Sequence, residues 1–547
     1  MATVGATLGP VEHTTAAALE EKAKLKKHFQ RFDIFFFLIC TIVGLDTLGA
    51  VSNFGAQAFL WLAFLGVFFF VPYGLLTAEL GSTFREEGGS YVWTKLALGR
   101  LPASLNTVLY WLSNPIWVAG TLAITALAVF DGFIVQSNTV GKYVFCLGFI
   151  WFTVGAAILS FGVGKWIPTI GAWCRILLLG GFTVTLILYA AEHGVHGVGL
   201  GDFNPSYAIF IAAVPVLFFN YVGFELPSAA GDEMTNPQQD VPYTIRRAIL
   251  VAFLCYGIPI LAVLLVLPRA QITSLGGFVD AVKTVFTVYG GTVTTAADGT
   301  STANLTGAGK VLGNLCAAGF IWALVSSGTT WIMGADRAQA VAAYDGAGPR
   351  WLGTFSKRWG TPIAANVASG VLGTVVMVCA FQLAGGDTNK YFSAALGLAI
   401  STTTISYLGI FPSLYLLRRK YPDVPRPYQV PGGLTGTLVI SALTWLWAAL
   451  ATISLLWPGF GTSGDWDAFL PEGFAGQRLQ YELTQFVPLA TILGLGLLFY
   501  ALGKPTRDRH VDVSLVDGGL AGPGLDMPTP RPETDPSNSS PGDRIRH

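Results

Sequence analysis

Two carboxylic acids stand inside long apolar segments of this chain. Asp46 lies in residues 40–49, CTIVGLDTLG, and Glu225 lies in residues 219–228, FNYVGFELPS. An ionised carboxylate at the centre of a lipid bilayer is costly, so each acid should face a polar cavity instead of lipid. The alternative for each acid is a protonated or hydrogen-bonded packing group. We expect the cavity, because both acids stand beside residues that interrupt a helix.

The interrupting residues are glycine and proline: two glycines flank Asp46, and a glycine and a proline flank Glu225. Backbone groups freed from the helical ladder inside a membrane are tolerated only where protein or a watery cavity satisfies them. The half-helix ends would offer N–H groups to a carboxylate and carbonyls to an ammonium, which predicts a small zwitterion or amine as ligand. The residues of the two breaks are the candidate ligand contacts: Val43, Gly44, Leu45, Asp46, Thr47, Asn220, Val222 and Gly223.

The composition excludes an ordinary soluble enzyme. Of 547 residues, 52% are hydrophobic and only 12% are charged, whereas soluble domains have about 25% charged residues. The formal net charge is zero, so no global field attracts nucleic acid. The apolar segments contain no His-x-x-x-His or Gly-x-Ser-x-Gly pattern and no cysteine spacing typical of metal sites. We therefore predict no enzymatic activity, no cofactor and no metal.

Apolar segments long enough to cross a bilayer recur along the chain. A transmembrane helix needs roughly twenty apolar residues, and by this criterion the sequence predicts an all-α polytopic membrane protein with about twelve spans. Their expected limits are 33–56, 59–83, 104–130, 142–161, 166–191, 206–230, 243–267, 309–335, 362–384, 391–417, 434–457 and 484–503.

Lysine and arginine are distributed unevenly among the connections. With the N-terminus in the cytoplasm, about 25 of them fall on inside segments and about 6 on outside segments. This excess predicts both termini in the cytoplasm and an even number of spans in the plasma membrane, that is, the cell inner membrane. The chain then divides into a cytoplasmic segment (1–32), a twelve-helix transporter domain (33–503) and a cytoplasmic tail (504–547). The tail is rich in Pro, Gly and Ser and is expected to be disordered.

The positions of the interrupted spans suggest an internal repeat. Spans one and six carry the breaks, and they are the first members of two five-helix sets. Interrupted segments at corresponding positions of two halves point to the binding site of a transporter. We therefore expect a five-plus-five inverted repeat followed by two further helices. Span eight adds Trp322, which is able to line a pocket, although tryptophan also anchors helices at the membrane interface.

Short motifs follow spans two, six, eight and ten. They are residues 87–91 (EGGSY), 223–225 with 232–237 (GFE and DEMTNP), 336–337 with 344–349 (DR and YDGAGP), and 426–431 (RPYQVP). In this order and spacing they resemble the amino acid, polyamine and organocation transporter superfamily, whose members have the leucine-transporter fold. The resemblance covers about residues 30–505.

The resemblance implies roles for residues of both breaks. In the family the first break is usually a glycine, a small residue and a second glycine, but here Asp46 replaces the second glycine. Polyamine-transporting relatives are similar in having a glutamate near this point. The resemblance therefore implies a cationic amine, or the amino group of an ordinary amino acid, as the partner of Asp46. Phe219 looks like the family's aromatic gate over the substrate, and Glu225 matches a glutamate tied to proton-linked opening in some members.

Arg175 lies deep inside span five. Its position is similar to that of a family lysine whose ammonium takes the place of a sodium ion. A fixed cation there implies proton coupling or exchange instead of sodium coupling. The alternative is an arginine whose guanidinium reaches toward the membrane interface.

These features predict a secondary transporter, a permease that moves amino acids or related organic amines across the plasma membrane by proton coupling or exchange. Its expected partners are a small-molecule substrate and the lipid bilayer, with no nucleic acid, and the sequence does not give the oligomeric state. Two alternatives stay open. One is a polyamine-selective transporter, and the other is a channel or sensor that binds an amine without transporting it.

Overall fold

The computed structural model is built almost entirely of helices. It describes residues 11–47, 51, 54–159, 165–195, 197, 199–267, 275–295, 301–383, 388–471 and 473–514. The first half contains α1 (Ala16–Lys22), α2 (Arg31–Ile42), α4 (Ala56–Leu65), α5 (Val71–Thr83), α6 (Ser90–Leu98), α7 (Arg100–Trp117), α8 (Ala123–Phe133), α9 (Thr139–Ile158), α11 (Trp166–His193), α12 (Tyr207–Phe219) and α13 (Pro237–Val266). The second half contains α14 (Leu275–Phe286), α15 (Gly307–Ala342), α16 (Ile363–Leu383), α17 (Thr388–Ile410), α18 (Ser413–Lys420), α19 (Gly433–Leu456), α20 (Arg478–Leu502) and α21 (Lys504–Arg507).

Shorter elements connect these helices. The π-helical turns are η1 (Gly66–Phe70), η2 (Val118–Leu122) and η7 (Ala343–Ala347). The 3₁₀ turns are η3 (Leu200–Asp202), η4 (Leu226–Glu233), η6 (Thr287–Tyr289), η8 (Arg350–Gly353) and η9 (Trp466–Phe469). Strands β1 (Val11–Thr15) and β4 (His510–Ser514) form one antiparallel sheet, and β2 (Gly291–Thr295) and β3 (Ser301–Leu305) form another.

Each of the twelve predicted segments contains a helix. Nine helical segments in the described part of the chain are long and apolar enough to cross a membrane. They are Ala56–Thr83, Arg100–Phe133, Thr139–Ile158, Trp166–His193, Pro237–Val266, Gly307–Ala347, Lys390–Lys420, Gly433–Leu456 and Arg478–Leu502. Shorter apolar helices accompany them, among them Tyr207–Phe219 in the interrupted sixth span. The chain is thus a multi-pass all-α membrane protein, and the total of twelve spans stays a prediction.

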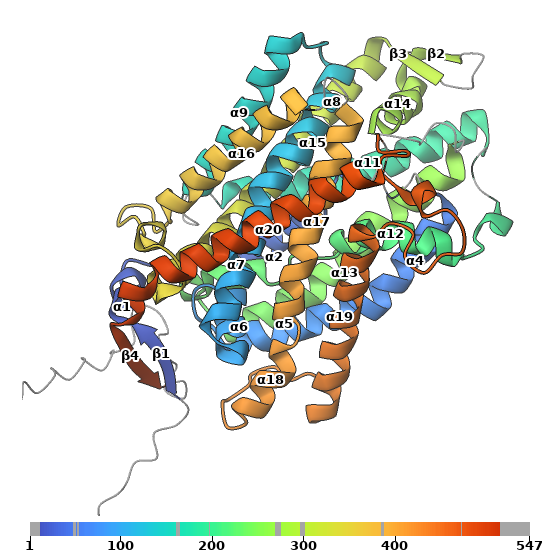
Figure 1. Ribbon diagram of the computed structural model, residues 1–547. Helices are drawn as coiled ribbons and strands as arrows, with labels where there is room; N and C mark the ends of the chain where they lie inside the picture. Colours follow the sequence, from blue (N-terminus) through green and yellow to red (C-terminus); the bar gives the residue numbers. More distant parts are fainter. Residues whose placement is uncertain are drawn as a thin grey trace, which may run out of the picture.

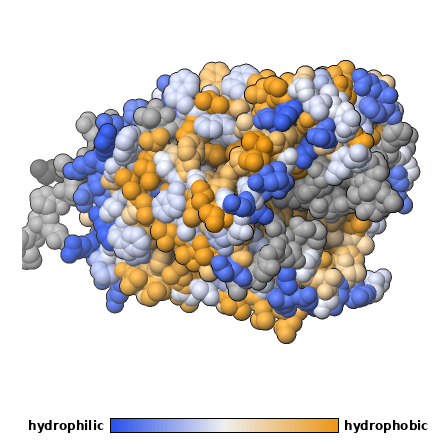
Figure 2. Space-filling model, turned by 90° about the horizontal axis from the view of Figure 1, so that it is seen from above, coloured by the Kyte–Doolittle hydropathy of each residue, from blue (hydrophilic) through white to orange (hydrophobic). Residues whose placement is uncertain are grey.

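The distribution of polar and apolar side chains is the reverse of that in a soluble protein: polar side chains face inward and apolar side chains face outward. On α11, Arg175 is completely buried, whereas Leu177 two residues later is 69% exposed. Leu438 on α19 and Leu497 on α20 likewise present exposed apolar side chains. Apolar residues are spread over the face of the molecule seen in Figure 2, and hydrophilic residues gather at its left edge and again toward its right and lower edges. Such a surface suits lipid, since the apolar side chains meet hydrocarbon while the charged group stays inside the protein.

Helices α7 and α15 form the centre of the bundle. They pack against each other, α17 and α20 pack on α7, and α11 packs on α15 (Figure 1). The two small sheets lie at opposite ends of the molecule, β1–β4 beside α1 and β2–β3 beside α14 (Figure 1). Both central helices carry buried polar residues, among them Asn114 on α7 and Ser326 and Asp336 on α15.

The end of the bundle beside α1 is held closed by buried ion pairs. Arg337, at the end of α15, pairs with Glu87 at 2.8 Å and also with Glu233. Lys22 of α1 pairs with Asp232 at 3.4 Å. Three of the sequence motifs supply Glu87, Asp232, Glu233 and Arg337, so these motifs join the second, sixth and eighth spans to one another and to α1 at this end.

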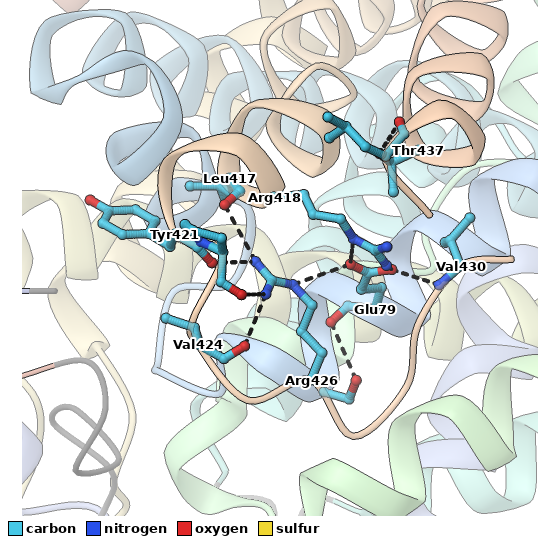
Figure 3. A network of polar contacts seen from close by, with 11 residues as sticks. Glu79, Leu417, Arg418, Tyr421, Val424, Arg426, Val430 and Thr437 are labelled. Carbon is cyan, nitrogen blue, oxygen red and sulfur yellow. Dashed lines mark hydrogen bonds and ion pairs between the residues drawn. The ribbon is translucent and has the colours of Figure 1, made fainter. Parts of the chain in front are cut away.

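The motif after span ten folds its own loop against α5 (Figure 3). Arg418 and Arg426 both approach Glu79, at 2.5 and 3.4 Å. Arg426 also donates to the carbonyl of Tyr421 at 2.7 Å, and the N–H of Val430 donates to Glu79 at 2.6 Å. This motif therefore stabilises the connection between α18 and α19.

The two ends of the chain meet in the sheet of β1 and β4. Thr15 at the end of β1 donates its hydroxyl hydrogen to the carbonyl of Tyr344 at 2.6 Å, which fixes this sheet to the bundle. The sequence predicted disorder from residue 504 onward, but residues 504–514 form α21 and β4. The backbone of β1 supplies the hydrogen-bond partners that the tail composition cannot supply by itself. Residues 515–547, the rest of the predicted tail, lie outside the described residues.

Candidate functional site

Both predicted helix breaks are confirmed. Helix α2 ends at Ile42, and after α12 ends at Phe219 helical structure does not resume until Leu226. Gly223, within the second break, has a φ of +123°, and a Cβ there would lie 2.4 Å from the methyl carbon of Thr41. Only glycine fits this backbone conformation and this close approach.

Two tyrosine hydroxyls satisfy the backbone groups that the breaks release. The hydroxyl of Tyr256 accepts from the N–H of Gly44 at 2.7 Å and donates to the carbonyl of Ile42 at 2.9 Å. The hydroxyl of Tyr73 accepts from two consecutive N–H groups of the second break, at 3.0 and 2.9 Å. Tyr256 of α13 and Tyr73 of α5 therefore hydrogen-bond to backbone groups that the two breaks release.

The two breaks border one small cavity, with about 250 Å³ of empty space that includes the part open to solvent. Its lining combines backbone, carboxylate, amide, hydroxyl and aromatic groups from spans one, three, six, seven and eight. The lining residues are Thr41, Ile42, Gly44, Asp46, Thr47, Trp117, Phe219, Asn220, Tyr256 and Trp331. In the described part of the chain, no group of three or more His, Cys, Asp or Glu stands in position to hold a metal ion.

Asp46 and Asn220 each present one unused polar atom in this cavity. Asp46 is 2% exposed, and its Oδ2 accepts from the indole N–H of Trp117 at 2.8 Å, while its Oδ1 has no partner among the described residues. Asn220 is 4% exposed, and its Oδ1 accepts from the hydroxyl of Thr47, while its Nδ2 is likewise unpaired within the described chain. Both atoms are thus available to a ligand in this cavity, and pairing them would remove the cost of burying a polar atom without a partner.

Aromatic rings enclose the side of the cavity that Asp46 faces. Trp117 lies edge-on to Phe219 and to Trp331, with ring centroids 5.9 Å apart in both pairs. The indole N–H of Trp331 donates to the carbonyl of Thr41 at 3.0 Å, which fixes this ring against the end of α2. Aromatic faces attract cations, so a carboxylate among these rings is suited to an ammonium group.

Glu225 lies behind the cavity and is not part of its lining. Its carboxylate accepts hydrogen bonds from three tyrosine hydroxyls, those of Tyr73, Tyr110 and Tyr407, the latter two at 2.6 Å. Tyr73 also accepts from the N–H of Gly223 at 3.0 Å. A change in the proton on Glu225 would therefore alter hydrogen bonds that reach the backbone of the second break.

Arg175 joins the end of α2 to α15. Its guanidinium donates to the carbonyl of Val43 at 2.9 Å, to the carbonyl of Ala323 at 2.6 Å and to the hydroxyl of Ser326 at 2.7 Å, and it also contacts Ser327. No carboxylate among the described residues lies within ion-pair distance of it. The carbonyl end of a helix favours a cation, and this geometry excludes the alternative of a guanidinium that reaches the membrane interface.

The structure brings together five of the predicted contacts and sets the others around them. Gly44, Asp46, Thr47, Phe219 and Asn220 line the cavity. Val43, Val222 and Gly223 are backbone of the two breaks, and Leu45 lines a separate apolar cavity of about 730 Å³, a volume that includes space open to solvent. The predicted polar residues Asp46, Thr47 and Asn220 therefore lie together in one cavity, and their contact with a substrate stays a prediction.

Trp322 lies elsewhere than the sequence predicted. Its ring centroid is 6.2 Å from that of Phe152 on α9, and Phe152 is itself 53% exposed on the apolar surface. Trp331, further along α15, is the span-eight indole that lines the cavity, and it replaces Trp322 as the candidate contact. Tyr73 and Tyr256, which the sequence did not single out, hold the two breaks.

Known proteins resemble this chain over most of its length. A family model described as "Amino acid permease" matches residues 29–465. The probable agmatine/putrescine antiporter AguD of Lactococcus lactis is 28% identical over 504 residues, which covers 90% of this chain and 97% of that protein. The inner membrane transporter YjeM of Salmonella typhimurium is 23% identical, over 76% of this chain and 87% of its own length.

A solved structure resembles the fold. A mutant of the manganese transporter of Eremococcus coleocola aligns with a TM-score of 0.53 at 10% sequence identity, over 89% of this chain and 95% of that one. At this identity the likeness concerns the fold alone.

Proposed function

This chain belongs to the amino acid permease family and is a secondary transporter, and we propose that its substrates are amino acids or related organic amines. The observation that carries the proposal is Oδ1 of Asp46, which has no hydrogen-bond partner in the described part of the chain and lies in the cavity between the two breaks. A carboxylate about 4 Å from an ammonium gains roughly 4 kcal/mol at an effective dielectric near 20, before desolvation is subtracted. The rings of Trp117 and Trp331 add to this preference for a cation.

Two buried residues support exchange or proton coupling as the mechanism. Arg175 supplies a fixed positive charge at the carbonyl end of α2, so that no sodium ion is needed there. Glu225 is joined through Tyr73 to the backbone of the second break, so its protonation state acts on the cavity wall. Glu225 is therefore the proposed coupling residue, and Arg175 the proposed substitute for a coupling ion.

The name of one relative supports a second candidate. That relative is a probable agmatine/putrescine antiporter, so a polyamine-selective transporter is the alternative. Asp46 would hold one ammonium group of such a substrate, as it would hold the amino group of an amino acid. A sensor or channel that binds an amine without transporting it is the alternative from a different class.

Transport by the purified protein in lipid vesicles tests the proposal. Vesicles preloaded with an unlabelled amino acid or amine should accumulate the same labelled compound against its gradient if the protein is an exchanger. If the protein is proton-coupled instead, an inward proton gradient should drive uptake into vesicles that contain no substrate. Replacing external sodium by potassium should change neither rate. Binding of amines without any transport would favour the sensor. Movement of amines only down their concentration gradient, without accumulation, would favour the channel.

We also propose that the protein lies in the plasma membrane with both termini, including the tail beyond residue 514, in the cytoplasm. The excess of lysine and arginine on one set of connections supports this orientation. A cysteine at the exposed position Gln136, between α8 and α9, should react with an impermeant maleimide added outside intact cells. A cysteine at the exposed position Asp423, between α18 and α19, should react only after the membrane is opened. Labelling is compared with that of the protein without the added cysteine. Labelling at position 423 from outside intact cells, with labelling at position 136 only after the membrane is opened, contradicts the orientation.

A further inference from the structure

The cavity contains two unused polar atoms of opposite kind. Oδ1 of Asp46 is an acceptor, and Nδ2 of Asn220 is a donor. Both side chains are buried, and both line the same cavity. A ligand that satisfies them must therefore present a donor to the first atom and an acceptor to the second.

The hydroxyl of Thr47 sets which atom of Asn220 remains free. Thr47 donates to Oδ1 of the amide, so that the N–H₂ group is the part left for a ligand. Thr47 is also the residue next to Asp46 in the chain, so one short segment carries the carboxylate and orients the amide.

The cavity has one carboxylate and no second anion. Among its lining residues Asp46 is the only acid, since Glu225 lies behind the wall with its oxygens turned to three tyrosines. A second ammonium in the ligand would meet the N–H₂ donor of Asn220, and no second carboxylate stands among the described lining residues to pair with it.

We infer, resting on the proposed function, that Asn220 is a specificity-determining residue. It selects substrates that carry one ammonium group and one nearby hydrogen-bond acceptor, such as a carboxylate, a carbonyl or a hydroxyl. It discriminates against diamines, whose second ammonium has no acceptor in this cavity. A site that hydrogen-bonds a substrate group rejects an analogue lacking that group, because its own polar atom is then left unpaired.

Matched ligands of equal chain length test this selection. At chain lengths of two to four carbons, the probes are the amino carboxylate, the amino alcohol, the diamine and the plain alkylamine. Competition against a bound labelled amine should rank the amino carboxylate and amino alcohol at least tenfold above the diamine for the wild-type protein. The plain alkylamine should fall below both acceptor-bearing ligands.

Two substitutions of Asn220 distinguish the effect of its N–H₂ donor from the effect of its size and shape. Asn220→Asp exchanges the donor for a second carboxylate of the same shape, so the preference should reverse and the diamine should bind at least tenfold better than the amino carboxylate. Asn220→Ala removes the donor without adding charge, so the acceptor-bearing ligands should lose their advantage over the alkylamine while the diamine gains nothing. If the aspartate variant is unstable, the alanine variant and ligand-induced shifts of its unfolding temperature decide the question.

The outcomes distinguish this inference from the proposed function. Equal binding of diamine and amino carboxylate to the wild-type protein, with the ratio unchanged in both variants, overturns the role of Asn220 while amine binding stands. Absence of any binding that depends on the amino group means that the proposed function itself has failed. A wild-type preference for the diamine also overturns the inference and favours the polyamine alternative.

Discussion

An Asp46→Asn variant is expected to bind cationic amines at least tenfold more weakly than the wild-type protein. Asparagine keeps the size of the side chain and an acceptor for the indole N–H of Trp117, which now donates at 2.8 Å. It turns an N–H₂ group toward the position of the unpartnered oxygen, so the attraction for an ammonium is lost and a donor faces it instead. Competition binding on the purified protein measures the change, and a neutral ligand without an amino group should be hardly affected.

Asp336→Asn is the matched control for this substitution. Asp336 is also fully buried, but its oxygens accept from Trp111 at 2.9 Å, Ser369 at 2.7 Å and Asn366 at 2.7 Å, and it does not line the cavity. The control should lower the unfolding temperature and leave the ratio of amine to neutral-ligand affinity unchanged. Unchanged affinity of the Asp46→Asn protein for every ligand would mean that the acid is not a substrate contact.

Replacing Arg175 by alanine is expected to lower the free energy of unfolding by several kcal/mol, on the order of 3–5. The substitution removes the donors of the carbonyls of Val43 and Ala323 and of the hydroxyl of Ser326, at a depth where water cannot replace them. It also removes the connection between the end of α2 and α15. Thermal or denaturant unfolding in detergent measures the loss, and transport should fall with it.

Arg175→Lys separates the charge from the shape of the guanidinium. An ammonium keeps the positive charge at the end of α2, but it cannot reach carbonyls and hydroxyls on two helices with a planar set of donors. The lysine protein should therefore lie between the wild-type and alanine proteins in stability. An alanine protein as stable as the wild type would show that the interhelical hydrogen bonds contribute little, and the proposed substitute for a coupling ion would lose its support.

The helix breaks could be predicted from the sequence because their signal is local. Glycine, an acid and proline in an apolar segment are each unfavourable in a lipid-exposed helix, and here they occur together around Asp46 and Glu225. The depth of Arg175 is a signal of the same kind. These three residues were predicted as polar groups inside the protein, and all three are buried.

The partners of the breaks could not be predicted, because their positions depend on packing between distant segments. Tyr73 and Tyr256 are two of 18 tyrosines, each on an apolar helix, and nothing near them in the sequence shows that their hydroxyls meet a break. Trp322 and Trp331 lie on one helix that is apolar on all sides, so no amphipathic pattern tells which indole faces the interior. The cavity wall on span eight was therefore assigned to the wrong residue.

The tail illustrates a related limit. Its composition lacks the apolar residues needed for a core, and the sequence predicted disorder for that reason. A strand nevertheless forms at His510–Ser514, because Val11–Thr15 supplies an edge to pair with. That partner is separated from it by nearly the whole chain, and composition does not record such long-range pairing.

The pairing of β1 with β4 has a consequence for the path of the chain through the bilayer. Two strands that share hydrogen bonds must lie on the same side of a membrane, since a lipid layer cannot pass between them. The chain between Thr15 and His510 must then return to the side from which it started, whatever its route. The pairing therefore excludes an odd number of crossings between Thr15 and His510, and two halves of a divided reporter inserted beside β1 and β4 would be brought together by the fold itself.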